Sequence, residues 1–107
     1  MARVALLCPD LLFGSNVDGA LRAAGHEVTR DASSAVDVVV ADLTADGVDV
    51  ESIGARRDAA TLGFYPHVDV DTRRRAEAAG FDMVVPRSRM NREGAALVEK
   101  LAAGAAA

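Results

Sequence analysis

Apolar residues along the chain fall into short runs separated by polar segments of loop or helix length. The runs at 4–8, 36–43 and 60–65 are largely apolar, without strict alternation. Such runs are typical of strands buried on both faces in a parallel sheet. Residues 26–30 alternate like a strand with one exposed face, and 82–86 form a short fifth strand. The pattern therefore predicts five strands.

Helices are predicted in the intervals between these strands. Over 17–24, apolar residues recur at i, i+3, i+4 and i+7, behind an N-cap at Ser15 and before a stop at Gly25. Asp69 is placed to cap a second helix that runs through Ala79. A weak short helix around 50–58 and a closing helix over 91–103 complete the set.

The order of these elements predicts the fold class. Strands that alternate with helices at this spacing form an α/β, doubly wound parallel sheet with right-handed crossovers. Five strands in a chain of 107 residues favour the flavodoxin-like strand order 2-1-3-4-5. We expect residues 1–107 to form a single domain, which is long enough for its own hydrophobic core.

Composition narrows the function classes. The net charge of −4 argues against a nucleic-acid-binding protein, which normally carries a basic excess. The one cysteine, Cys8, has no partner for an internal disulfide, which fits a reducing cytoplasm. No signal-like segment and no apolar run of membrane-spanning length is found, so no membrane contact is expected. We expect a cytoplasmic protein.

The predicted fold places a candidate site at one edge of the sheet. In open parallel sheets, ligands bind outside the carboxyl ends of the strands, where the strand order switches. Several polar side chains follow the predicted strands at that edge. They are Asp10, Asp42, Tyr65, His67, Arg87 and Ser88.

Two of these segments resemble response-regulator receiver domains. "VDVVVADL" (36–43) is similar to the receiver's third strand, with Asp42 at the position of the phosphoacceptor aspartate. "AEAAGFDMVVPR" (76–87) is similar to the fourth helix and fifth strand, with Arg87 where receivers carry a lysine. The resemblance implies the five-stranded receiver fold.

The same resemblance implies that phosphotransfer has been lost. Receivers hold Mg²⁺ with two adjacent acids after the first strand, and those positions here are Cys8 and Pro9, with Asp10 one place late. Tyr65 stands where receivers have a smaller hydroxyl residue. Only Asp10 and Asp42 remain as candidate Mg²⁺ ligands, although this chemistry requires several carboxylates.

The segment "DLLFG" (10–14) is unusually apolar for such an edge. One interpretation is a partner patch of Leu11, Leu12, Phe13 and Phe64, because exposed apolar patches mark interaction sites. The other is that the segment folds onto the core, with Leu11 opening the first helix. The sequence leaves both open.

The leading hypothesis is a non-enzymatic pseudo-receiver that signals through protein contact and needs no cofactor. It would bind a protein partner or form a homodimer through the face made by the last two helices and the fifth strand. One alternative is an atypical receiver that is phosphorylated on Asp42 with Mg²⁺. Another is a small-molecule or anion binder at the same edge, enclosed by Phe13, Tyr65 and Arg87.

Overall fold

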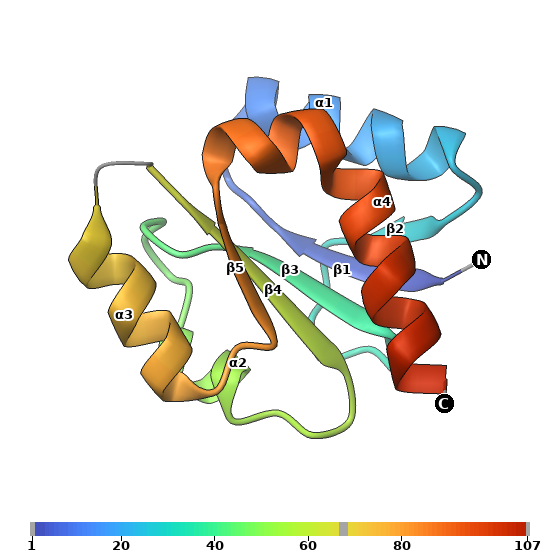
Figure 1. The fold of residues 1–107 in the computed structure, drawn as a ribbon. Helices are drawn as coiled ribbons and strands as arrows, with labels where there is room; N and C mark the ends of the chain where they lie inside the picture. Colours follow the sequence, from blue (N-terminus) through green and yellow to red (C-terminus); the bar gives the residue numbers. More distant parts are fainter. Residues whose placement is uncertain (1, 67–68, 107) are drawn as a thin grey trace.

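The chain forms a five-stranded parallel sheet in the order β2-β1-β3-β4-β5, as predicted. This computed structural model describes residues 2–66 and 69–106. The sheet pairs each strand in parallel with its neighbours (Figure 1). The strands are β1 (Arg3–Leu7), β2 (Glu27–Thr29), β3 (Val38–Asp42), β4 (Ala60–Tyr65) and β5 (Met83–Pro86).

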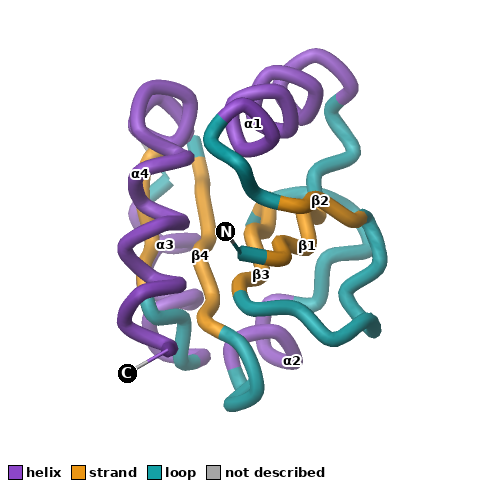
Figure 2. Tube along the Cα trace, turned by 90° about the vertical axis from the view of Figure 1, so that its right-hand side faces the viewer, coloured by secondary structure: helices purple, strands orange, loops and turns teal. Residues whose placement is uncertain are grey.

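Helices cover both faces of the sheet (Figures 1 and 2). They are α1 (Leu11–Ala23), α2 (Val50–Gly54), α3 (Val70–Ala79) and α4 (Arg87–Ala106). α1 and α4 lie on one face and α2 and α3 on the other. None of the described helices is both long and apolar enough to cross a bilayer.

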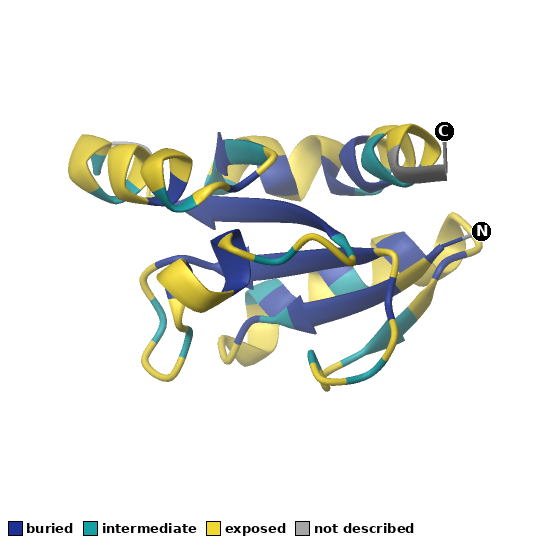
Figure 3. Ribbon diagram, turned by 90° about the horizontal axis from the view of Figure 1, so that it is seen from below, coloured by how far each residue is buried: buried dark blue, intermediate teal, exposed yellow. Residues whose placement is uncertain are grey.

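The three central strands, β1, β3 and β4, are buried on both faces, as their apolar runs predict. In β3, Val38 and Val40 pack toward α1 and α4, while Val39 and Ala41 pack toward α2 and α3. All four side chains are fully buried. Figure 3 shows this as dark-blue strands between helices whose outer turns are exposed. Two apolar layers, one on each face of the sheet, therefore hold the carboxyl ends of these strands in place.

The predicted boundaries of α3 are confirmed. The Asp69 carboxylate accepts a hydrogen bond from the Thr72 amide at 3.1 Å, which caps the start of the helix. The helix ends at Ala79, and Gly80 adopts a left-handed conformation with φ of 109°.

α1 does not begin behind Ser15, as the capping pattern predicts, but at Leu11, as the second interpretation of the apolar segment has it. Asp10, not Ser15, is the N-cap, and its carboxylate accepts a hydrogen bond from the Phe13 amide at 3.0 Å. Once Asp10 satisfies that amide, the segment from Leu11 onward continues as helix, and Ser15 lies exposed within it. The apolar segment is thus the first turn of a helix.

The predicted start of the closing helix is also wrong, because α4 begins at Arg87 instead of residue 91. It follows directly from Pro86, the last residue of β5. Met90 in this first turn is buried and belongs to the core. Met90 shares one face of the helix with Leu97 and Val98, which are buried in the same core, so packing extends the helix to a turn before its predicted start.

Candidate functional site

Asp10 and Arg87 meet at the carboxyl edge of the sheet. Arg87 is the first residue of α4, and its Nη2 lies 2.6 Å from Asp10 Oδ2. The other oxygen, Asp10 Oδ1, accepts the capping hydrogen bond from the Phe13 amide. Both carboxylate oxygens of Asp10 are therefore engaged within the protein.

The Arg87 guanidinium also stacks on an aromatic ring. Its Cζ lies 4.2 Å from the centroid of the Phe13 ring, a cation–π distance. The Phe13 ring in turn lies 5.1 Å from that of Phe64. We call Asp10, Phe13 and Arg87 the Arg87 clasp, because they join the first turns of α1 and α4.

The clasp lowers the pKa of Asp10 below its ordinary value of 3.8. The first cause is the hydrogen bond from the Phe13 amide, and the second is that from Arg87. Because the pKa is lower in the folded state, the ionised carboxylate stabilises the fold above the unfolded pKa. That contribution is lost as the pH falls through the folded pKa.

Substitution of Arg87 by methionine tests the clasp. We expect the Asp10 titration midpoint, followed through its side-chain carbonyl ¹³C shift, to rise in Arg87→Met. Asp69 is the matched control, since its pKa is lowered by the Thr72 hydroxyl and then the Thr72 amide, without an arginine. Its midpoint should stay where it is. An unchanged Asp10 midpoint would mean that the ion pair is not formed in solution.

Asp42 ends β3, as predicted, and its side chain is turned to its own loop. It is 7% exposed, and its Oδ1 accepts hydrogen bonds from the Thr44 amide at 3.2 Å and hydroxyl at 3.1 Å. Within the described part of the chain, no hydrogen bond or ion pair joins Asp42 to Asp10 or Arg87. The same residues contain no group of three or more His, Cys, Asp or Glu placed to hold a metal ion.

Cys8 occupies the edge beside these carboxylates as a buried, free thiol. Burial raises its pKa; the Asp42 and Asp10 charges act in the same direction, against Arg87 and a backbone hydrogen bond at Asp10. The thiol therefore stays protonated near neutral pH. A neutral thiol is a poor Mg²⁺ ligand, because that cation prefers oxygen donors.

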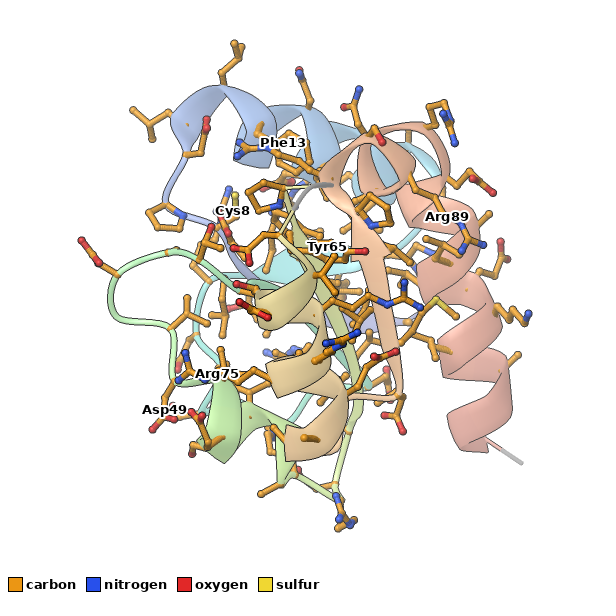
Figure 4. All side chains as sticks on the ribbon, turned by 60° about the vertical axis from the view of Figure 1, so that its left-hand side comes forward. Cys8, Phe13, Asp49, Tyr65, Arg75 and Arg89 are labelled. Atoms are coloured by element: carbon orange, nitrogen blue, oxygen red, sulfur yellow. The ribbon has the colours of Figure 1, made fainter. Side chains whose placement is uncertain are left out.

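Of the other predicted site residues, Ser88 lies beside the clasp and Tyr65 does not. Tyr65 is buried against α2 and α3, on the opposite face of the sheet, so it does not join Phe13 and Arg87 in one pocket. Figure 4 shows Tyr65, Cys8 and Phe13 toward the same end of the sheet. Ser88 is exposed at the start of α4. His67 falls outside the described residues.

The four residues of the predicted partner patch differ in their exposure. Leu11 is 89% exposed and Leu12 76%, so the interpretation that both fold onto the core is wrong. Phe13 is half-buried. Phe64 is only 1% exposed and belongs to the core, because successive residues of a two-sided strand are covered by helices on both faces.

A cleft of about 420 Å³ opens between the first turns of α1 and α4. The Arg87 clasp forms part of its lining, together with Leu12, Asn16, Ser88 and Asn91. Sequence analysis missed Asn16 and Asn91, because nothing local shows that their two helices converge. Asp10 as an N-cap could have been found, since an Asp that follows a strand and precedes a helical segment favours that role.

A larger cleft, about 610 Å³, lies at the opposite end of β4 and β5. Most of its charged groups are already satisfied within the protein. Arg56 pairs with Asp58 at 2.9 Å, and Asp82 accepts hydrogen bonds from the Thr61 amide and hydroxyl. Arg57 donates to three carbonyls at the end of α2. The cleft between α1 and α4 is the stronger candidate because exposed apolar side chains adjoin it.

Comparison with solved structures identifies the fold. The chain superimposes on the signal receiver domain of NarL from Mycobacterium tuberculosis, described as a response regulator, with a TM-score of 0.76. Sequence identity is 21%, over 96% of this chain and 97% of that domain. A response regulator from Thermotoga maritima matches with a TM-score of 0.75 and 16% identity, over 94% and 97% of the two chains. The chain has the receiver-domain fold.

Sequence comparisons add no further identification. No protein-family model matches the chain, and no curated protein matches it.

Proposed function

We propose that this chain is a non-enzymatic pseudo-receiver that signals through protein contact, in the cytoplasm and without phosphotransfer. The observation that carries the proposal is the double engagement of Asp10. One of its oxygens caps α1 and the other binds Arg87. Mg²⁺ would therefore compete at Asp10 with the Phe13 amide and with the Arg87 guanidinium, whose charge already neutralises the carboxylate.

The chemistry of phosphotransfer supports this conclusion. Transfer of a phosphoryl group to an aspartate needs a cation that neutralises the developing charge, held by several oxygen ligands. The positions after β1 that would supply those ligands hold Cys8, whose thiol is protonated, and Pro9. The remaining edge carboxylate, Asp42, is turned to Thr44.

An amide NMR titration with Mg²⁺ and then beryllium fluoride, a phosphoryl mimic, tests the proposal. We expect a flat response at millimolar Mg²⁺ and no new shifts with beryllium fluoride. Asp42→Asn is the control, and it should give the same flat response as the native chain. Shifts centred on Asp10, Asp42 and Arg87 that vanish in Asp42→Asn would overturn the proposal.

One observation favours the alternative of an atypical, phosphorylatable receiver. Asp42 Oδ2 accepts no hydrogen bond within the described residues, so one oxygen of the candidate phosphoacceptor is unengaged. Phosphorylation would then require Arg87 to leave Asp10 and turn toward Asp42. The positive outcome of the same titration would establish this alternative.

The proposal extends to self-association through the face formed by α3, β5 and α4. β5 is an edge strand, and Met83 and Val84 in it are only half-buried. An edge strand presents unpaired backbone groups that a second copy can approach. This face shares α4 with the cleft between α1 and α4, whereas β5 and α3 contribute no residue to the lining of that cleft.

A further inference from the structure

We propose that the cleft between the first turns of α1 and α4 binds a peptide segment in which an acidic residue stands beside a bulky apolar one. The inference rests on the proposed function, for which it names the chemistry of the partner. The cleft, at about 420 Å³, has room for a large side chain and its neighbour. Its apolar wall, its polar lining and its charge each point to such a segment.

The apolar wall comes from the first turn of α1. Leu12 lines the cleft and is 76% exposed, and Leu11 beside it is 89% exposed. Among the described residues, the other large apolar side chain with comparable exposure is Val70, on α3 at 50%. Two adjacent leucines exposed at the mouth of a cleft are typical of a surface that a partner covers.

The polar lining suits a polypeptide. Asn16 on α1 and Asn91 on α4 contribute primary amides to the same cleft. Each such amide offers a donor and an acceptor side by side, which complements the N–H and C=O of a peptide group. Ser88 adds a hydroxyl that can donate or accept.

The charge around the cleft favours an acidic segment. Arg87, Arg89 and Arg92 are matched by only two carboxylates, those of Asp10 and Glu93. The N-termini of α1 and α4 add positive partial charge, and neither helix has an acidic residue in its first turn. Asp10 and Arg87, the charged residues that line the cleft, neutralise each other, while Arg89 and Arg92 share one carboxylate, Glu93. One net positive charge therefore lies beside the cleft, in a chain whose net charge is −4.

The same charge argues against a second copy of this chain in the cleft. In a symmetric dimer through this edge, the helix N-termini and the arginines of both copies would face one another. Like charges across an interface weaken association, so the leucines are better covered by an acidic partner.

Selection from a random peptide library on the immobilised full chain tests the inference. We expect the enriched peptides to carry an aspartate or glutamate beside leucine, isoleucine or an aromatic residue. An enriched peptide, synthesised and titrated into labelled protein, should shift the amides of Leu12, Asn16 and Asn91. Calorimetry then gives its affinity for the native chain and for the variants.

Three variants separate the contributions to binding. Leu12→Ser should weaken binding about tenfold, through loss of buried apolar area. Asn91→Asp places a carboxylate near the start of α4, where a negative charge stabilises the helix. The same charge repels an acidic ligand, so we expect binding to be about fivefold weaker. Val70→Ser, an exposed apolar change on α3, is the control and should leave the affinity unchanged.

Several outcomes would overturn the inference. They are no enrichment over uncoated support, enrichment of basic peptides, shifts outside the cleft, or affinity unaffected by Leu12→Ser. A dimer in sedimentation that Leu12→Ser abolishes would assign the leucines to a second copy instead. The Mg²⁺ titration tests the proposed function independently of peptide binding. If Mg²⁺ gives no shifts and no peptide binds, only the peptide inference is overturned. If Mg²⁺ gives shifts and a peptide binds, only the pseudo-receiver proposal is overturned.

Discussion

Replacement of Phe64 by alanine is expected to lower the free energy of unfolding by about 3–5 kcal/mol. Phe64 is 1% exposed in β4, and it packs in the core beneath α1 and α4. Its loss removes a large apolar side chain and leaves a cavity among strands and helices that can collapse only partly. Since domains of this size are stable by roughly 5–15 kcal/mol, the loss is a large share of the total.

The effect should extend to the clasp. The centroid of the Phe13 ring lies 5.1 Å from that of Phe64, and the Arg87 guanidinium stacks on the Phe13 ring. Without Phe64 beneath it, the Phe13 ring gains freedom, and the α1–α4 contact loosens. Backbone amides at the start of α1 should therefore exchange faster with solvent in Phe64→Ala, relative to amides in α3.

Denaturant unfolding measures the stability change as a shift in midpoint at constant slope. Phe64→Leu is the control; it keeps most of the volume and should cost less than about 1.5 kcal/mol. A loss in Phe64→Ala no greater than that of the leucine variant would show that the ring is not packed in the core as described.

The fold was predictable because its signals are local. Neighbouring residues alone indicate β3, through its apolar run. They also indicate both ends of α3, which are set by Asp69 and Gly80. Burial on two faces leaves a continuous apolar run, and capping depends on hydrogen bonds within one turn. Strand order then follows from the alternation of strands and helices.

The site was less predictable because its contacts are distant. Arg87 and Asp10 are 77 residues apart in sequence, and no local pattern indicates that they pair. The α1 boundary was missed because Ser15 with Asp18 imitates a capping signal, while Asp10 stands before an apolar segment typical of a loop or a core contact. The end of each strand can be read from the sequence, but the face on which Tyr65 points depends on the register of β4.

Glycine positions are another case where close approach is invisible in sequence. The ends of α2 and α3 meet through Gly54 and Gly80. A Cβ on Gly54 would lie 2.6 Å from the Ala79 carbonyl oxygen, and one on Gly80 would lie 2.5 Å from the Gly54 carbonyl oxygen. These are backbone atoms, which cannot move aside as a flexible side chain can. The two helix ends must therefore separate if either glycine gains a side chain.

Alanine substitutions at Gly25, Gly54 and Gly80 are expected to separate two costs to the free energy of unfolding. One is the clash between the ends of α2 and α3, and the other is left-handed backbone strain. Gly25 has φ of 91° in open space, so Gly25→Ala should cost about 1–2 kcal/mol from left-handed strain alone. Gly54→Ala should cost about 1–3 kcal/mol from overpacking, partly offset by helix propensity. Gly80→Ala combines strain and clash, so about 2–5 kcal/mol is expected.

Gly19→Ala in α1 completes the series as a control. Its Cβ meets nothing within 4 Å, so a better helix former there should stabilise the fold by roughly 0.5–1 kcal/mol. Denaturant midpoints should then fall in the order Gly19→Ala, native, Gly25→Ala and Gly80→Ala. Equal losses of stability at Gly25 and Gly80 would show that α2 and α3 do not approach closely. Backbone strain alone would then account for the cost of Gly80→Ala. A larger loss at Gly80 means that these two helix ends are fixed by backbone contact.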